Sequence, residues 1–283
     1  MREPHPLGEF LRARRALVRP EDAGVVVTGV RRTPGLRREE VATLAGISAD
    51  YYLRLEQGRD RHPSAQVLDA LARVLRLDAA AVDHLHGLAA DAPSRPRATR
   101  DAVPTSTAQL LAVLELPAFV ESRRFDVLAA NPLATALSPA IVPGANRLRS
   151  VLLDPVEQAL LPDWERAIGG MIASFRTSIG PGRADPATSS LIEELTARSE
   201  VFRTHWSRHD VRPLEGGGVV MAHPAVGRLD LRREKLRVGG TDGQVLVIHH
   251  AEPGTPTAER LALLGSLAAP GQRPAALKSS PST

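Results

Sequence analysis

Two short segments separated by a three-residue turn constrain the fold of this chain more than any other feature. They read REEVATLA, GIS and ADYYLRLE and span residues 38–56. Gly46 suits the left-handed position that ends a helix, and Ser48 offers a side-chain oxygen that can cap the next one. Ala42 is small enough to let the two helices cross closely. The spacing therefore predicts a helix-turn-helix.

The same spacing gives the two helices an inner and an outer face. The side chains expected to seal the angle between the helices are Val41, Ala45, Ile47, Tyr52 and Leu55. The side chains expected to face outward, toward a DNA major groove wide enough for one helix, are Ala49, Asp50, Tyr51 and Arg54. A helical hairpin in an ordinary bundle is the alternative interpretation.

Charge favours the first interpretation because it is concentrated around this motif. Residues 1–100 hold 17 arginines against 13 carboxylates, so the whole formal excess of +4 lies there. Cationic side chains that neutralise phosphates provide the affinity of nucleic-acid binding. A solvated basic face would have the same composition, so charge alone does not decide.

The chain divides at a segment rich in proline, serine and arginine. We predict a helix-turn-helix domain over residues 1–91, a linker over 92–107, a second domain over 108–269 and a disordered tail over 270–283. Apolar spacing predicts helices throughout the first domain. In the second domain, AFVES, RFDVLAAN, GGVVMAHP, GRLDLRREKLRV and GQVLVIHH are expected strands, with helices over 154–178, 187–209 and 257–269. The expected fold class is multidomain, α followed by α+β.

The sequence lacks the residues and motifs that several classes of function require. The chain has no cysteine, which excludes disulfides and thiolate metal sites. It carries no signal-peptide pattern and no apolar run of about 18 residues, so we expect a soluble, cytoplasmic protein without a membrane span. P-loop, dinucleotide, nucleophile-elbow and zinc-protease motifs are missing as well. His249 and His250 are adjacent on an expected strand, must face opposite ways and cannot share a metal. We expect no enzyme activity, cofactor or metal.

Several separated motifs resemble one family of regulators. They are the run from TPGLRREEV to DALARVL, with FDVLAANPLA, LLDPVEQALLPDWE, FRTHWSRHDV and HPAVGRLDL, and they cover about residues 7–265. The chain resembles actinobacterial Xre-type helix-turn-helix regulators that carry an MmyB-like ligand-binding domain. The resemblance implies a five-helix first domain and a PAS-like second domain.

The resemblance also implies roles in DNA binding. Base edges would be read by Ala49, Asp50 and Arg54, beside Ser48 and Tyr51. Phosphates would be contacted by Arg38, Arg59 and Arg61, and by Arg31 and Arg32 in the loop ahead of the motif. For the two loop arginines, a solvated surface position is the alternative.

In the second domain we expect large rings to gather around a core or a ligand cavity. The candidate ligand-binding residues are Phe119, Phe125, Asn131, Trp164, Phe202, Trp206 and His209. His205 and His209 would share a helix face, and His209 adjoins Asp210, so a metal or acid–base site is the alternative; the resemblance does not cover His205. The family usually has Trp where this chain has Ala130, which leaves the size of the cavity and the nature of the ligand open.

The sequence thus predicts a DNA-binding regulator, a repressor in most such families, that is controlled by a small apolar ligand. A homodimer would read a near-palindromic operator in double-stranded DNA. One alternative is a second domain that serves only dimerisation or a protein partner. The other is an enzyme with an appended DNA-binding domain, which depends on His209 and Asp210 alone.

Overall fold

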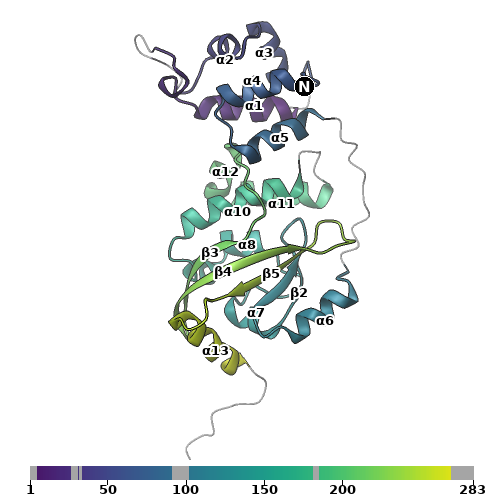
Figure 1. Ribbon diagram of the computed structural model, residues 1–283, viewed down its shortest axis with the longest axis vertical. Helices are drawn as coiled ribbons and strands as arrows, with labels where there is room; N and C mark the ends of the chain where they lie inside the picture. Colours follow the sequence, from purple (N-terminus) through teal and green to yellow (C-terminus); the bar gives the residue numbers. More distant parts are fainter. Residues whose placement is uncertain (1–4, 27–30, 32–33, 91–101, 181–184, 269–283) are drawn as a thin grey trace, which may run out of the picture. The chain divides into compact units, whose positions relative to one another are not determined.

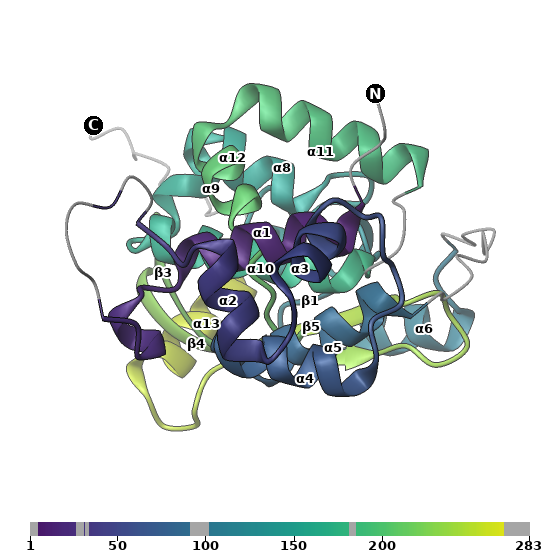
Figure 2. The ribbon, with the colours of Figure 1, turned by 90° about the horizontal axis from the view of Figure 1, so that it is seen from above.

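The computed structural model describes residues 5–26, 31, 34–90, 102–180 and 185–268. These residues form two compact units, coloured along the chain in Figure 1 and Figure 2. The first unit takes its residues from Met1–Ala98 and Glu165–Leu214, and the second from Thr99–Trp164 and Glu215–Thr283. Arg32, residues 92–101 of the predicted linker and the predicted tail 270–283 lie outside the described residues.

The first unit begins with helices whose ends follow local capping rules. They are α1 (Pro6–Leu17), α2 (Arg38–Ala45), α3 (Ala49–Glu56), α4 (Ala65–Val74) and α5 (Ala79–Ala89), with a 3-10 turn at Glu21–Ala23. The side chains of Ser48, Ser64 and Asp78 accept hydrogen bonds from the first turns of α3, α4 and α5. Gly46 ends α2 at a φ of +70°. The expected helix-turn-helix is present.

One hydrophobic core joins these helices. Phe10 from α1, Tyr52 and Leu55 from α3 and Leu85 from α5 are fully buried in it. Of the residues expected to seal the angle between α2 and α3, Val41 is also buried, while Ala45 and Ile47 pack at the edge of the core. The apolar spacing read from the sequence therefore corresponds to the packed face.

Three later helices belong to the same unit. They are α10 (Trp164–Ile179), α11 (Pro186–Arg198) and α12 (Glu200–Ser207), of which only Trp164 is grouped with the second unit. Val211, just beyond α12, packs against the core of α1–α5. The two compact units therefore have different limits from the domains predicted from the sequence. The predicted domain limits stay a prediction.

The second unit is built on a five-stranded antiparallel sheet in the order β2-β1-β5-β4-β3. The strands are β1 (Ala118–Glu121), β2 (Val127–Ala130), β3 (Gly217–His223), β4 (Gly227–Arg237) and β5 (Val245–His250). Its helices are α6 (Thr105–Val113), α7 (Pro132–Leu137), α8 (Arg147–Leu153), α9 (Pro155–Ala159) and α13 (Pro256–Ala268). The two units confirm the multidomain α and α+β fold class.

The two faces of the sheet pack against different helices. Residues on one face, Ala118, Val120 and Leu246, pack with Leu111 of α6. We call the opposite face, which carries Phe119, Lys235, Val247 and His249, the inner face. On the inner face Phe119 and Val247 pack with Ala134 of α7, and two β4 leucines, Leu229 and Leu231, pack with Leu261 and Leu264 of α13.

The structure corrects several expected helices. Helix α6 starts at Thr105, inside the predicted linker. Its sequence shows no apolar helical repeat that would predict it, because Leu111 is its one buried residue. Helix α8 was not predicted, because its seven residues are too few for apolar side chains to show a helical repeat. The helix expected over 154–178 is interrupted around Pro162, and the helix expected over 187–209 is interrupted at Ser199, which caps α12.

Helices α1 and α3 approach each other closely at Gly8. A Cβ at this position would lie 2.3 Å from the backbone oxygen of Glu56, which cannot move independently of α3. We expect Gly8→Ala to lower the free energy of unfolding by about 1–3 kcal/mol, measured by urea denaturation. Gly218→Ala is the control, because a Cβ there would meet nothing within 4 Å. Equal effects of the two variants would contradict this close packing.

Candidate functional site

The outer face of α3 presents the residues expected to read DNA. Ser48, Ala49 and Asp50 are exposed, while Tyr51 and Arg54 are partly covered. The Ser48 hydroxyl accepts a hydrogen bond from the Tyr51 N–H at 3.1 Å, so this serine also fixes the start of the helix. The structure therefore brings these five residues together on one exposed surface.

Asp50 and Arg54 form an ion pair one helical turn apart. The Asp50 side chain is 74% exposed and the Arg54 side chain 43% exposed. The Arg54 guanidinium also lies 5.6 Å from the centre of the Tyr51 ring. The carboxylate on this helix therefore orients the arginine beside it, which the sequence analysis did not anticipate.

A buried carboxylate at the end of α3 organises the arginines around the motif. Glu56 is 2% exposed and binds Arg15 of α1 at 2.7 Å and Arg38 of α2 at 2.6 Å. The hydrogen bond to Glu56 raises the pKa of Arg38. Arg12 of α1 donates to the backbone oxygen of Glu56 at 3.2 Å, which satisfies a free carbonyl at the end of α3. The three helices are thus joined by polar contacts as well as by the core.

The expected phosphate-contacting arginines have different surroundings. Arg38 uses Nε for Glu56, yet 45% of its side chain is exposed. Arg31 pairs with Glu40 at 2.7 Å, and its hydrogen bond lowers the pKa of that carboxyl. Arg59 is exposed, and Arg61 is exposed with Nε donating to the Gly58 carbonyl. Arg32 lies outside the described residues.

The expected ligand-binding residues divide between the units. Phe119, Phe125, Asn131 and Trp164 belong to the second, and Phe202, Trp206 and His209 to the first. Asn131 caps α7 and makes four hydrogen bonds, with the amides of Ala118 and Ala134 and the carbonyls of Leu114 and Leu116. Its amide is saturated by backbone groups, so its observed role is structural.

The aromatic residues of the second unit lie in two kinds of surroundings. Phe119 and Phe125 are buried, and Phe119 stacks on His249 with ring centres 6.2 Å apart. The Trp164 indole donates to the Val151 carbonyl at 2.8 Å. Phe119 and Phe125 therefore lie among charged side chains of the inner face, under Arg147 and Lys235 respectively.

Buried cations gather on the inner face, which the sequence analysis missed. Lys235 pairs with Glu121 at 2.8 Å, and Arg147 of α8 pairs with Glu157 at 3.3 Å. Arg233 has the Glu121 carboxylate nearby, but its Nε is buried with no hydrogen-bond partner among the described residues. Burial lowers the pKa of Arg233. The alternation of Arg233 and Lys235 along β4 is the signal that could have predicted this cluster.

His249 lies opposite Arg233 in the sheet register and is 6% exposed. Its Nδ1 has no hydrogen-bond partner among the described residues. Burial, reinforced by nearby Arg233, lowers the pKa of His249 to about 3, so the ring is neutral near pH 7. The inner face thus combines a buried guanidinium Nε and a buried imidazole nitrogen, neither with a hydrogen-bond partner among the described residues.

The HWSRHD segment packs against the helix-turn-helix. Asp210 binds Arg14 of α1 at 2.5 Å, and the His209 ring meets the Phe10 ring edge-on with centres 6.4 Å apart. Arg176 of α10 lies 3.7 Å from the centre of the Trp206 ring. We call this segment and its contacts with α1 the α1–α12 joint.

The metal interpretation of this segment loses its geometry. Helix α12 ends at Ser207, and His209 follows at a φ of +54°, so His205 and His209 do not share a helical face as expected. Among the described residues no group of three potential ligands could hold a metal ion.

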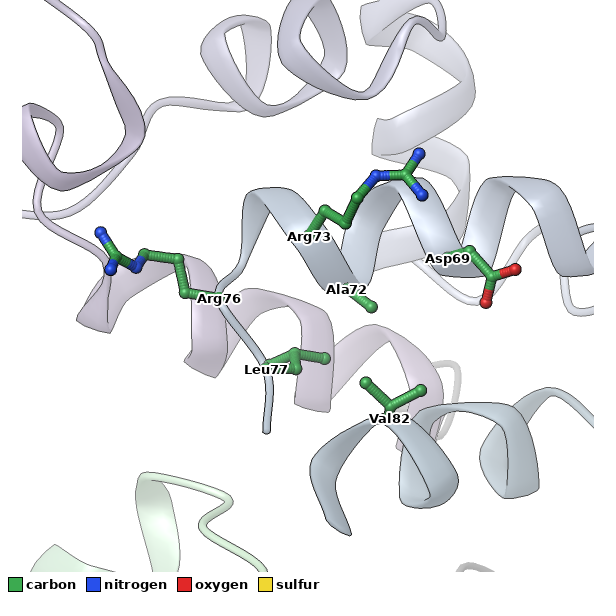
Figure 3. Close-up of a pocket in the computed structure, with 6 residues that line it drawn as sticks. All are labelled: Asp69, Ala72, Arg73, Arg76, Leu77 and Val82. Atoms are coloured by element: carbon green, nitrogen blue, oxygen red, sulfur yellow. The ribbon is translucent and has the colours of Figure 1, made fainter. Parts of the chain in front are cut away.

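A pocket of about 510 Å³ lies between α4 and α5. Ala72, Leu77 and Val82 line it with apolar atoms, and Asp69, Arg73 and Arg76 surround them (Figure 3). The Arg76 guanidinium is held by the Asp22 carbonyl at 2.7 Å. None of the expected ligand-binding residues lines this pocket.

Two partly buried histidines make the first unit sensitive to acid. Burial lowers the pKa of His84 to about 4 and that of His209 to about 3, and positive Arg176 contributes to both shifts. The unfolded rings titrate near 6.5, so the folded unit binds fewer protons below that pH. This contribution to stability is complete above about pH 6.5 and is lost as the pH falls toward the folded values.

We therefore expect the free energy of unfolding to decrease between pH 7 and pH 4, and to decrease less steeply in His84→Gln. The measurement is urea unfolding followed by tryptophan fluorescence. His86→Gln is the control on the same helix, since His86 is exposed and pairs with Asp69. A His84→Gln slope equal to that of the wild type would contradict the assignment.

Family models match both parts of the chain. Residues 6–85 match a helix-turn-helix domain model, and residues 103–264 match the MmyB-like transcription regulator ligand binding domain. A comparison with curated proteins finds no match. No helix within the described ranges is long and apolar enough to cross a membrane. The matched domains are those of a transcription regulator, and the chain belongs to the family that carries the MmyB-like transcription regulator ligand binding domain.

Proposed function

We propose that the protein is a sequence-specific repressor whose operator binding is controlled by a small molecule bound in its second unit. The exposed face of α3 is the observation that carries the DNA-binding part of the proposal. A helix capped and held in this way can enter the major groove, and a homodimer would read a near-palindrome. A protein bound over its operator excludes other proteins from the same DNA, which is the basis for proposing repression.

The Asp50–Arg54 pair suggests how bases would be read. The arginine can donate to guanine O6 and N7, and the carboxylate can accept from cytosine N4. The carboxylate also repels phosphate, so it lowers the affinity for DNA of any sequence and increases the preference for the correct sequence. Arg59 and Arg61, with Arg38, Arg31 and Arg32, are proposed to contact the backbone.

We expect Asp50→Ala to relax the preference at one base pair by about 1–3 kcal/mol, while non-specific binding is retained or strengthened. Fluorescence anisotropy with a duplex selected from a random pool, and with its single-base variants, measures both quantities. Arg54→Ala should weaken the selected duplex specifically, whereas Arg59→Ala should weaken all duplexes alike. An unchanged base preference in Asp50→Ala would contradict base reading by this residue and leave only its contribution to the helix dipole.

Arg38→Ala is a less direct test of phosphate binding than Arg59→Ala. It removes one of the two arginines that pair with buried Glu56, so it should also lower stability. Binding by this variant is therefore interpreted together with its unfolding curve.

The charges of the inner face refine the expected apolar effector. Arg233 offers a buried donor without a partner, and the neutral His249 ring can donate from Nδ1 when it carries its proton there, beside the apolar rings of Phe119 and Phe125. An unsatisfied buried polar group is costly, and an anionic group would satisfy both. We propose an effector with an apolar body and one anionic group, such as a carboxylate.

Thermal shift with a panel of linear and aromatic carboxylates, each paired with its neutral primary amide, tests this proposal. We expect some carboxylates to raise the melting temperature more than their amides, and Arg233→Gln to abolish the difference. Arg232→Gln is the matched control, because Arg232 is the neighbouring β4 residue on the other face and is exposed. Stabilisation by amides and carboxylates alike would contradict the anionic group, and no stabilisation by any compound would favour a second unit that binds only protein.

A further inference from the structure

We infer that the α1–α12 joint couples the ligand-binding part of the chain to the DNA-binding helices. The inference rests on the proposed function, since it concerns how the two binding events communicate. It assigns positioning roles to Asp210 and His209, which act through α1 on α3, the proposed recognition helix.

An ion pair forms the polar half of the joint. Arg14 Nη1 of α1 lies 2.5 Å from Asp210 Oδ1, and both side chains are mostly shielded from solvent. The second oxygen of Asp210 binds Arg208 at 3.0 Å. One carboxylate therefore holds an arginine from each side of the joint, and only the bond to Arg14 crosses it.

A ring cluster forms the apolar half. Phe10 of α1 is fully buried and contacts the His84 ring at 5.3 Å and the His209 ring at 6.4 Å between centres. His209 holds a left-handed backbone, which is uncommon for a residue other than glycine. Arg176 Nη2 donates to the Trp206 carbonyl at 2.5 Å and fixes the turn that presents His209.

The joint is connected to the recognition helix by packing. Phe10 shares one hydrophobic core with Tyr52 and Leu55 of α3. Protein cores are close-packed, so a displacement of Phe10 cannot occur without adjustment of its neighbours. One path from His209 to α3 therefore passes through the buried Phe10 ring.

The joint is also connected to the second unit, through the chain itself. Helix α10 begins at Trp164, whose indole binds the Val151 carbonyl of α8. After the joint, the chain leaves the first unit at Leu214 and enters β3 at Gly217. Residues 165–214 are thus inserted between two parts of the sheet unit, and both ends of this insert connect the units, besides the segment ahead of α6.

Coupling between two binding sites is reciprocal, so DNA bound at α3 must affect residues 200–211 if effector binding affects α3 through them. The coupling can therefore be tested with DNA and without a known effector. Full-length protein is compared by hydrogen exchange with and without the selected duplex at saturation. In the wild type we expect exchange to slow at least threefold in α3 and also in residues 200–211. In Arg14→Gln we expect the slowing in α3 to persist and that in residues 200–211 to disappear. Asp210→Asn should behave in the same way as Arg14→Gln.

Arg208→Gln is the matched control, because it removes an ion pair with the same carboxylate without crossing the joint. It should behave like the wild type. The inference is overturned if DNA leaves exchange in residues 200–211 of the wild type unchanged, or if Arg14→Gln and Asp210→Asn retain the slowing. Absence of slowing in α3 of the wild type would overturn the proposed function itself.

Discussion

Burial of the Glu56 carboxylate is the interaction on which the DNA-binding helices depend. A lone buried carboxylate is strongly unfavourable, so it must be matched by cations with good geometry. Arg15 of α1 and Arg38 of α2 supply them, each to a different oxygen. The end of the recognition helix is thereby fixed to both preceding helices, and Gly8 gives α1 the space to reach it.

The arginines of this chain have three different kinds of surroundings, which differ in burial. Around α3, the guanidinium groups are exposed or half-exposed, as the proposed contacts with phosphates and bases require. In the α1–α12 joint, Arg14 is shielded and paired, which makes it a connector. On the inner face, Arg233 lies among more cations than carboxylates, and its Nε is buried without a partner among the described residues. It is therefore a candidate for binding an anion. The excess of arginine near the N-terminus includes Arg14, so it covers the first two of these surroundings.

The features that could be predicted from the sequence are those that depend on neighbouring residues. Gly46 and Ser48 act as expected because a turn and a cap need only neighbouring residues, and the strands follow from alternation and glycine turns. Long-range pairing was missed. Nothing near Glu56 in the sequence indicates Arg15, and nothing near Asp210 indicates Arg14. The HWSRHD segment is predicted from its sequence to have a structural or pocket-wall role, with a reactive site as the alternative, and its packing against α1 depends on residues far away in the chain.

Selection of bound DNA from a random duplex pool by the full-length protein, near physiological salt, tests the central claim most directly. The account predicts enrichment of a near-palindromic sequence whose half-sites lie about one turn of DNA, roughly 34–36 Å, apart. It also predicts that the same selection by Arg54→Ala loses the enriched bases. A pool that stays random with the wild-type protein, despite measurable binding, would contradict sequence reading by α3.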